Sequence, residues 1–347
     1  MIKLRNNKKT LDMYGDSVLR WKHEGRLYCL QVERDDFPDD PRSDCDNITT
    51  MACFYPRHSL GDEVKEKDPE GFWRQLVRDH VSDSEILAAV EAGKLNGIRI
   101  APNSETPDLV DVYEIYAIWT PVGKSEPKEC LEYEGIPKDA LTEYLVDDMT
   151  IRHCMTLMEP YAEWLPLYVY EHSGLSISCG ARTYPYNDPW DSSAVGWIIA
   201  MKDTIMKEVG CEYVLDESGN RIKEVHTHTD GKPATWSYKT RPLTEESWRK
   251  RAREIMEGNV ETYDQYLTGD VYGFRLYDIT GTNDDVIDED EIVEEDSCWG
   301  FYGSDVMENG IADNIGCGLA EAILAGTVEV GSVKKRTHTV TETTFEF

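Results

Sequence analysis

The sequence predicts an α+β fold in which a mostly antiparallel mixed sheet is flanked by several helices. In the central stretch, residues 163–200, two short apolar runs at 165–170 and 175–178 flank Ser173-Gly174. This pattern is typical of two strands joined by a tight turn. A third strand is predicted at 196–200. Elsewhere the hydrophobic period becomes that of a helix, so the sheet is expected to carry helices.

The length and composition favour one main domain with insertions. The chain has 347 residues, 40% of them hydrophobic, with 9 Trp, 19 Tyr and 7 Phe, which is enough to fill a core. Single cores tend to stop growing at roughly 250–300 residues. Residues 1–62 are predicted to form strands and an acidic loop, 63–150 a helical and strand insertion, and 151–347 an α+β core. We expect this core to form one domain with residues 1–62.

The first third of the chain shows clear changes of pattern. Residues 26–32 alternate as a strand does, an Asp- and Pro-rich loop follows at 35–47, and a second strand is predicted at 48–55. From Gly71 the apolar residues share one helical face. A capping box at 82–85 predicts the start of a second helix.

The middle of the chain is predicted to contain both strands and helices. Residues 112–119 are β-branched and aromatic, which favours a strand, and Pro137 is placed to open a helix. A short helix is predicted at 202–209, closed by Gly210. Residues 222–238 predict a hairpin that turns at Asp230-Gly231. A helix predicted at 248–257 runs up to Gly258.

The last part of the chain alternates between regular elements and an acidic segment. Residues 260–274 predict a helix leading into a strand, and 281–295 an acidic spacer between strands. Residues 296–303 are expected to end the next strand in an aromatic cluster framed by glycines. A helix is predicted at 313–324, and the tail 332–347 is predicted to close a sheet edge.

The charge limits the classes of partner. With 36 Lys and Arg against 67 Asp and Glu, the formal net charge is −31. Such a field repels a phosphate backbone and attracts basic proteins over a distance. We therefore predict a basic partner, no direct nucleic-acid contact and no membrane contact, and we leave homo-oligomer formation open.

Nine cysteines, with no C-x-x-C pair, predict reduced and mostly buried thiols. The N-terminus shows no signal peptide, and no apolar run approaches the roughly 18 residues that a membrane helix needs. These observations predict a cytoplasmic location.

One string resembles a metal site. His226-Thr227-His228-Thr229-Asp230 is similar to the H-x-H-x-D of metallo-β-lactamase-type hydrolases, but Gly231 stands where the next ligand His is needed. The string also alternates within a predicted hairpin, which favours two His on one sheet face. The acidic residues 283–294 contain no Gly and so do not match a calcium loop. We predict no metal and no cofactor.

Catalytic candidates are few. No P-loop, dinucleotide fingerprint, kinase signature or G-x-S-x-G elbow occurs in the sequence. The alternative to a non-enzymatic protein is a metal-dependent hydrolase acting on a nucleotide or nucleic acid. It would be built from His58, His172, Asp191 and neighbouring acids.

The candidate binding residues are aromatics that alternate with carboxylates. Such rings belong either to the core or to a surface, and we leave both interpretations open. Carboxylates beside Trp and Tyr are costly in a core, whereas at the rim of an interface they attract Lys and Arg while the rings supply area. The predicted set is Tyr186, Trp190, Asp191, Tyr263, Asp264, Tyr266, Asp270, Asp284, Asp285, Asp288, Glu289, Asp290, Glu291, Asp296, Trp299 and Tyr302.

Several strings, in order along the chain, carry a family resemblance. They are DN at 46–47 with Met51, RHSLGD at 57–62, LPLY at 165–168 with HSG at 172–174, PWDS at 189–192 with Gly196, VETYDQYLTGDVYG at 260–273 and DSCWGFYG at 296–303. Together they resemble a family of uncharacterised proteins carried by bacteriophages and other mobile elements. The chain departs from that family at Ile48-Thr49, where the family has Leu-Gly, and in a longer stretch between 178 and 189. The resemblance carries no agreed chemistry.

The resemblance implies a phage or mobile-element setting, in which small acidic accessory proteins block host immunity by occupying a nuclease. Our first hypothesis is therefore a non-enzymatic inhibitor of a restriction, CRISPR-Cas or other nuclease system in the host bacterial cytoplasm. Its carboxylates would stand in for phosphates and its aromatics for bases, as in a DNA mimic. The expected partner is a basic nucleic-acid-handling protein, either a nuclease or an effector subunit. A virion or assembly component is a third hypothesis, which rests on the tyrosine content alone.

Overall fold

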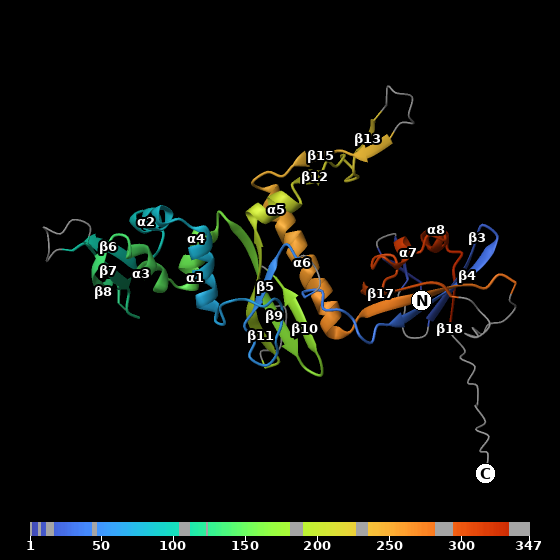
Figure 1. Cartoon of the computed structure of the whole chain (residues 1–347), viewed down its shortest axis with the longest axis horizontal. Coiled ribbons are helices and arrows are strands. Elements are labelled where there is room, and N and C mark those ends of the chain that lie inside the picture. Colours follow the sequence, from blue (N-terminus) through green and yellow to red (C-terminus); the bar gives the residue numbers. More distant parts are fainter. Residues whose placement is uncertain are drawn as a thin grey trace, which may run out of the picture. The chain divides into compact units, whose positions relative to one another are not determined.

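A computed structural model describes residues 2–5, 8–11, 17–43, 47–103, 112–122, 124–180, 190–226, 235–281 and 294–332 (Figure 1). The α+β class is confirmed, because helices alternate with sheets whose strands pair in antiparallel fashion. No helix among these residues is long and apolar enough to cross a membrane.

The chain groups into two compact units. Unit 1 comprises Met1–Cys45, Val169–Ser178 and Asn259–Phe347, and unit 2 comprises Asp46–Tyr168 and Cys179–Gly258. The predicted division at residues 62 and 150 follows the sequence pattern and stays a prediction. Each unit is described by itself.

Unit 1 contains a five-stranded antiparallel sheet in the order β17-β16-β4-β3-β18. Its strands are β3 (Ser17–His23), β4 (Arg26–Arg34), β16 (Val271–Asp278), β17 (Glu294–Tyr302) and β18 (Glu329–Ser332). One face packs on α7 (Ile311–Asn314) and α8 (Leu319–Ala325) around Trp21, Leu30 and Phe274, which are 0–1% exposed. A separate hairpin joins β1 (Ile2–Arg5) to β2 (Lys8–Leu11).

The single helix predicted at 313–324 is wrong, since two short helices occupy this stretch. Gly318 separates them with a left-handed backbone, φ +70°, and a Cβ there would lie 2.2 Å from His23 Nδ1. A glycine is therefore required where a continuous helix would place a side chain.

Unit 2 contains helices and a three-stranded sheet. The helices are α1 (Pro69–His80), α2 (Asp83–Glu91), α3 (Leu141–Asp147) and α4 (Ile151–Met158), and the sheet order is β6 (Ile98–Pro102), β7 (Val112–Trp119), β8 (Lys128–Pro137). Trp73 is fully buried in this core, and its ring lies edge-on to Trp164 at 5.2 Å and Trp197 at 5.7 Å. The strand predicted at 112–119 is confirmed. The helix predicted to open at Pro137 begins at Leu141, because Pro137 ends β8.

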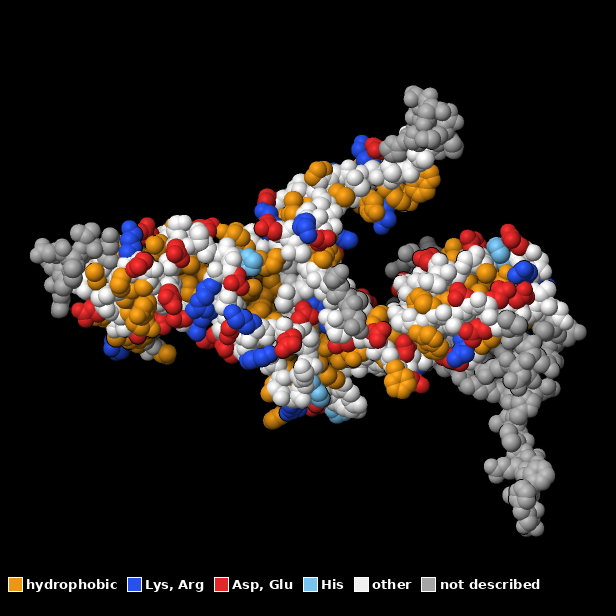
Figure 2. Space-filling model, in the orientation of Figure 1, with side chains coloured by type: hydrophobic (Ala, Val, Ile, Leu, Met, Phe, Trp, Pro, Cys, Tyr) orange, Lys and Arg blue, Asp and Glu red, His pale blue; other side chains and the backbone are white. Residues whose placement is uncertain are grey.

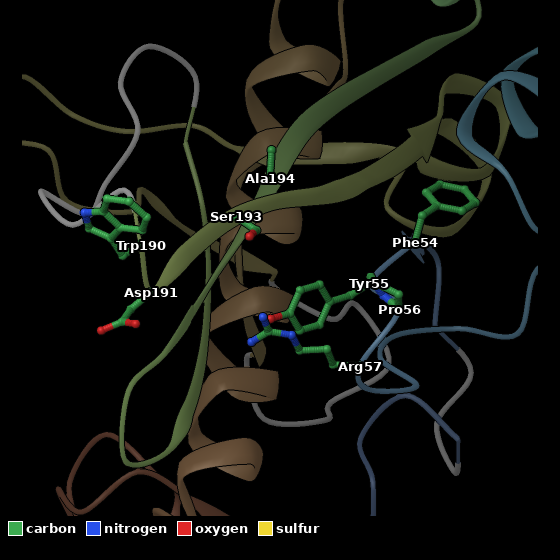
Figure 3. A pocket seen from close by; sticks show the side chains of 8 residues that line it. All are labelled: Phe54, Tyr55, Pro56, Arg57, Trp190, Asp191, Ser193 and Ala194. Carbon is green, nitrogen blue, oxygen red and sulfur yellow. The ribbon is translucent and has the colours of Figure 1, made fainter.

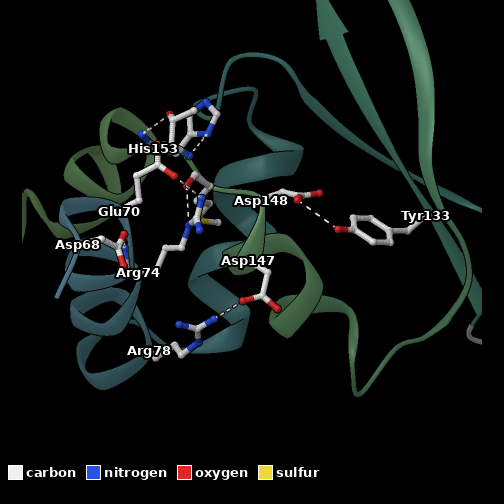
Figure 4. A network of polar contacts seen from close by, with 11 residues as sticks. Asp68, Glu70, Arg74, Arg78, Tyr133, Asp147, Asp148 and His153 are labelled. Atoms are coloured by element: carbon white, nitrogen blue, oxygen red, sulfur yellow. Dashed lines mark hydrogen bonds and ion pairs between the residues drawn. The ribbon is translucent and has the colours of Figure 1, made fainter. Parts of the chain in front are cut away.

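Side chains of α1 reach the neighbouring helices (Figure 4). Arg74 Nε donates to the carbonyl of Met149 at 2.9 Å and Arg74 Nη2 pairs with Glu70 at 3.0 Å, while Arg78 pairs with Asp147 at the end of α3. The arginines thereby satisfy backbone and carboxylate groups at helix ends, where the four last carbonyls lack helical partners.

The predicted capping box of α2 is confirmed. Ser82 caps the helix, and Glu85 accepts hydrogen bonds from the backbone and hydroxyl of Ser82 and from the hydroxyl of Tyr161. Led by the Ser82 hydroxyl, these donors lower the pKa of Glu85 from 4.5 to about 2. The carboxylate thus links the start of α2 to Tyr161, just before β9.

A four-stranded sheet has the order β10 (Leu175–Cys179), β9 (Ala162–Glu171), β11 (Ser192–Met201), β5 (Thr50–Cys53), which confirms the three strands predicted from the central stretch. Gly196 of β11 lies against β5, and a Cβ on it would be 1.9 Å from the carbonyl oxygen of Ala52. On the other side of β5, Asp62 accepts from the Met51 amide at 2.8 Å and donates its own amide to the Met51 carbonyl. Gly61 fits this turn because a Cβ would lie 2.3 Å from Met51 O.

Helix α6 (Ser247–Thr268) continues through Gly258, so the predicted stop at that glycine is wrong. Arg249 and Arg253 both pair with the buried carboxylate of Glu163 on β9, so α6 is fixed by charge as well as by packing. Gly269 ends α6 with φ +69°, and the predicted passage from helix to strand is confirmed by β16.

The remaining elements of unit 2 are α5 (Lys202–Glu208) and two antiparallel ribbons, β12 (Cys211–Tyr213) with β15 (Thr240–Pro242) and β13 (Lys223–His226) with β14 (Thr235–Tyr238). They confirm the predicted short helix and hairpin. The turn Asp230-Gly231 and the rest of the metal-like string lie outside the described residues, as does the His226 side chain.

The cysteines differ from the prediction of mostly buried thiols. Of the eight described, Cys29 and Cys154 are buried and Cys130 and Cys211 are exposed, while the others are half-buried; none forms a disulfide. Cys130 and Cys211 lie on strands whose side chains are largely exposed, so the fold gives them no core to enter.

The contact of Gly196 with β5 predicts a strong packing effect. Gly196→Ala should lower the free energy of unfolding by about 3 kcal/mol, because the clash is with backbone that cannot rotate away. Gly258→Ala is the matched control: a Cβ there meets open space, so this change should stabilise α6 by up to about 1 kcal/mol. Urea unfolding of both variants measures this, and equal effects would contradict the packing argument.

The low pKa of Glu85 predicts a pH-dependent contribution to stability. Since the folded value of about 2 lies below the ordinary value of 4.5, the contribution is fully present above pH 4.5 and is lost as the pH falls toward 2. Glu85→Gln should therefore be less stable than the native chain at pH 7, and the difference should shrink through this window. Urea unfolding between pH 7 and pH 3 tests this; a difference that stays constant with pH would contradict it.

Candidate protein-binding surface

Residues 35–43, here called the acidic loop, form a strongly charged segment of unit 1 between β4 and the rest of the chain. Within it Asp36, Phe37 and Asp39 are exposed, and the Phe37 side chain is 92% exposed. Within the described part of the chain, neither Asp36 nor Asp39 has a side-chain hydrogen bond or ion pair. An exposed phenyl ring therefore lies between two carboxylates that are available to a partner.

The acidic loop is held to the sheet at its first residue and at its middle. The amide of Asp35 donates to the carbonyl of Val271 at 2.9 Å, and the hydroxyl of Tyr302 donates to the carbonyl of Asp39 at 2.7 Å. Within the loop, the carboxylate of Asp35 accepts from the amide of Phe37 at 3.0 Å. A segment fixed in this way loses less conformational entropy when it binds.

The far end of the loop is anchored in the unit. Arg42 is 8% exposed and its guanidinium donates to the side chain of Asn259 at 3.4 Å. Its amide donates to the carboxylate of Asp40 at 2.8 Å, which closes a turn. Asp40 thus serves the local backbone, whereas Asp36 and Asp39 face solvent.

Tyr302 and Asp270, both predicted binding residues, lie next to this loop in the sheet register. Tyr302 pairs with Val271, and its side chain is half-buried. Asp270 accepts from the hydroxyl of Tyr272 at 2.9 Å, and burial, aided by this bond, raises the pKa of Tyr272. Tyr302 therefore holds the acidic loop directly, whereas Asp270 bonds the side chain of Tyr272.

Trp299 lies on β17 three residues before Tyr302 and is 42% exposed. Its indole covers Gly273 so closely that a Cβ on Gly273 would lie 1.9 Å from the ring, and the guanidinium of Arg275 is 5.9 Å from its ring centroid. Asp296 on the same strand is exposed and, within the described part of the chain, has no ion-pair partner. The glycine thus gives the indole a fixed position at the surface.

The predicted residues of α6 are more enclosed. Tyr263 is 2% exposed and stacks on the half-buried Tyr266 with ring centroids 5.9 Å apart, so its ring offers almost no area to a partner. Asp264 accepts from the hydroxyl of Ser176 and the amide of Ile177, both at 2.8 Å. These contacts join α6 to β10 within unit 1.

A second candidate site lies in unit 2, where a pocket of about 300 Å³ brings together two strings of the family resemblance (Figure 3). Arg57 and Tyr55 line it from one segment, and Trp190 and Asp191 line it from the start of β11. Trp190 is 92% exposed. The bonds that Gly61 and Asp62 make with β5 fix the segment that carries Arg57.

The alternative catalytic set is not assembled within either unit. His58 and Asp191 belong to unit 2 and His172 to unit 1. His58 is exposed and stacks on Tyr55 at 6.0 Å, and His172 is exposed and stacks on Tyr170 at 6.2 Å. Over the described ranges, no group of three or more His, Cys, Asp or Glu side chains is arranged to hold a metal ion.

Several predicted residues lie outside the described residues, namely Tyr186, Asp284, Asp285, Asp288, Glu289, Asp290 and Glu291. In the view of Figure 2, acidic side chains occur over both units and are interspersed with basic ones. The carboxylates therefore act locally, as in the acidic loop, and not as one continuous sheet of charge on this face.

Sequence reasoning missed Phe37 and Arg57. The signal for Phe37 was present, because a lone Phe within Asp35-Asp36-Phe37-Pro38-Asp39 has no apolar neighbours with which to enter a core. No comparable signal marked Arg57 as a pocket residue, since its neighbour across the pocket is more than a hundred residues away.

Comparison with known proteins gives no match: no family model, no curated protein and no solved structure is similar to this chain. The proposed function therefore rests on the site, on the net charge and on the family resemblance of the sequence strings.

The packing of the Trp299 indole on Gly273 gives a testable prediction. Gly273→Ala should lower the free energy of unfolding by about 1–3 kcal/mol, because the added Cβ overlaps the indole. In a Trp299→Ala background the same change should cost little, so a double-mutant cycle of urea unfolding should show coupling of about 1 kcal/mol or more. Additive effects would mean that the indole does not rest on Gly273.

Proposed function

We propose that this protein is a non-enzymatic binding protein that captures a basic protein partner through the acidic loop. The observation that carries the proposal is the 92% exposed Phe37 between the exposed, unpaired carboxylates of Asp36 and Asp39. A fully solvated phenyl ring is unfavourable in a free protein, and its burial in an interface removes apolar area from water.

The loop combines two properties that interfaces use. A central aromatic anchor supplies most of the binding energy, and surrounding charges fix orientation and accelerate encounter. Because Asp35 and Asp39, on either side of Phe37, are hydrogen-bonded to the sheet, the anchor is presented in a defined position. The net charge of −31 adds long-range attraction toward a positively charged partner.

The proposed partner is a basic nucleic-acid-handling protein, a nuclease or an effector subunit. A surface that normally binds phosphates and bases offers cations and flat apolar area, which the carboxylates and Phe37 match. From the family resemblance we further propose that the protein acts in a bacterial cytoplasm, where it would inhibit a restriction, CRISPR-Cas or other nuclease-based defence system.

The test is retention of a partner from a nuclease-treated bacterial lysate on the immobilised full-length protein. We expect a basic nucleic-acid-handling protein to be retained at low salt and released as salt rises. Phe37→Ala should weaken binding of the retained protein by about 30-fold, the effect of a typical interface hot spot. Asp36→Asn with Asp39→Asn should mainly slow association, because these charges steer the encounter.

The matched control is Glu126→Gln with Glu134→Gln, which makes the same change in net charge at exposed positions of unit 2. This pair should leave binding within about twofold of the native protein, since only charges near the contact act strongly at physiological salt. Equal loss in both double variants would show that net charge, not the acidic loop, governs binding. Retention of no basic protein would overturn the proposal.

A further inference from the structure

The ribbons of unit 2 present a row of three rings, of which Trp236 and Tyr213 are exposed and Tyr238, between them, is half-buried. The centroids of Trp236 and Tyr238 are 5.4 Å apart, and those of Tyr238 and Tyr213 are 5.7 Å apart, with interplanar angles of 79° and 77°. Trp236 is 57% and Tyr213 47% exposed. We call these three rings with Arg221 and Lys223 the ribbon face.

Two cations are interleaved with the rings. The guanidinium of Arg221 lies 4.2 Å from the centroid of Tyr213 and 5.6 Å from that of Tyr238. The ammonium of Lys223 lies 4.4 Å from Trp236 and 5.9 Å from Tyr238. Each cation therefore contacts two neighbouring rings, whose planes stand nearly perpendicular to each other.

Neither of these cations has a carboxylate partner within the described part of the chain. Their neighbours differ, since Lys239 pairs with Glu224 at 3.6 Å and Arg241 pairs with Glu212 at 2.7 Å. The ribbon thus neutralises one pair of cations and leaves Arg221 and Lys223 on the rings.

Strand register places the apolar groups on one side. In the antiparallel pairing of β13 with β14, Lys223 is opposite Tyr238 and Val225 is opposite Trp236, and directly opposed residues share a face. Val225 is 68% exposed. Figure 2 shows apolar side chains along one side of this ribbon.

The ribbons do not bury these side chains in a core. Each is two-stranded, and backbone bonds at Val214, Ile222 and Lys239 join them into one extension beyond α5 (Figure 1). A two-stranded ribbon is marginally stable by itself, and the five side chains of the ribbon face contact one another while four of them stay exposed to solvent.

We propose that the ribbon face binds single-stranded nucleic acid. Proteins that bind single strands combine aromatic platforms for the bases with cations for the backbone, and this is the combination that the ribbon face displays. An acidic peptide would pair with the two cations but would have no planar groups to contact the three neighbouring rings, so it fits the surface less well.

The net charge of −31 predicts no nucleic-acid contact for the chain as a whole, and the ribbon face is a local exception. At physiological salt the screening length is about 8 Å, so charges elsewhere are largely screened. The described residues of the ribbons, 211–226 and 235–243, carry Arg221, Lys223, Lys239 and Arg241 against Glu212, Asp216, Glu217 and Glu224, so they are locally neutral. Base stacking, worth about 1–3 kcal/mol per base, then outweighs the screened repulsion between the chain and the phosphates.

The experiment is fluorescence anisotropy of a labelled oligothymidylate of about 12 nucleotides, within the footprint of small single-strand binders, titrated with the full chain. The native protein should bind it. Trp236→Ala should weaken binding about 5- to 150-fold, the equivalent of one stacked base. Trp119→Ala, which removes a 46% exposed indole from β7, is the ring control and should change nothing.

The cations are tested by salt dependence. For single strands the slope of log K against log salt is about 0.7 per phosphate contact, so Arg221→Gln with Lys223→Gln should reduce it by about 1.4. Lys239→Gln with Arg241→Gln makes the same charge change at the carboxylate-paired positions and should leave the slope unchanged. This comparison keeps the test valid even if Trp236→Ala disturbs the hairpin.

Three results would overturn the inference. They are no binding of the oligonucleotide by the native protein, equal effects of the two double variants, and displacement of the oligonucleotide by a poly-glutamate peptide whose own binding is unaffected by Trp236→Ala. The last result would identify a carboxylate-binding surface. None of them bears on the acidic loop, which is tested by Phe37→Ala.

Discussion

The register of β16 between β4 and β17 is the constraint on which the candidate surface depends. Tyr272 pairs with Arg34 at the end of β4, and Val271 pairs with Tyr302 at the end of β17. The acidic loop begins one residue after β4, so its first amide meets Val271 and its later carbonyl meets Tyr302. A slip of one residue would turn every side chain of β16 to the opposite face and would remove both anchors together.

The two proposed surfaces show that an average charge says little about a local one. The acidic loop has carboxylates around one ring, while the ribbon face has cations between three rings. Both use exposed aromatic groups held by the backbone, and they differ in the sign of the charge that accompanies them. Local geometry therefore selects the partner where screening has weakened the field of the whole chain.

Local signals in the sequence predicted the elements whose causes are local. The β-branched run at 112–119 and the capping box at Ser82 are confirmed because each depends on residues within a few positions. The continuation of α6 through Gly258 and the break at Gly318 depend on contacts with Glu163 and His23, which are remote in sequence. Tyr263 and Trp299 have similar sequence contexts, each an aromatic residue near carboxylates. Only Trp299 faces solvent, with its indole lying on the backbone of Gly273.

Edge strands give part of the acidic composition a further role. β8 and β17 lie at the edges of their sheets, and they carry exposed carboxylates such as Glu132, Glu134 and Asp296. An edge presents unpaired backbone groups, and like charges along it oppose the approach of another strand. Part of the net charge thus protects the chain against aggregation through edge-to-edge pairing. Replacement of these carboxylates by neutral side chains would therefore decrease colloidal stability even if the fold is intact.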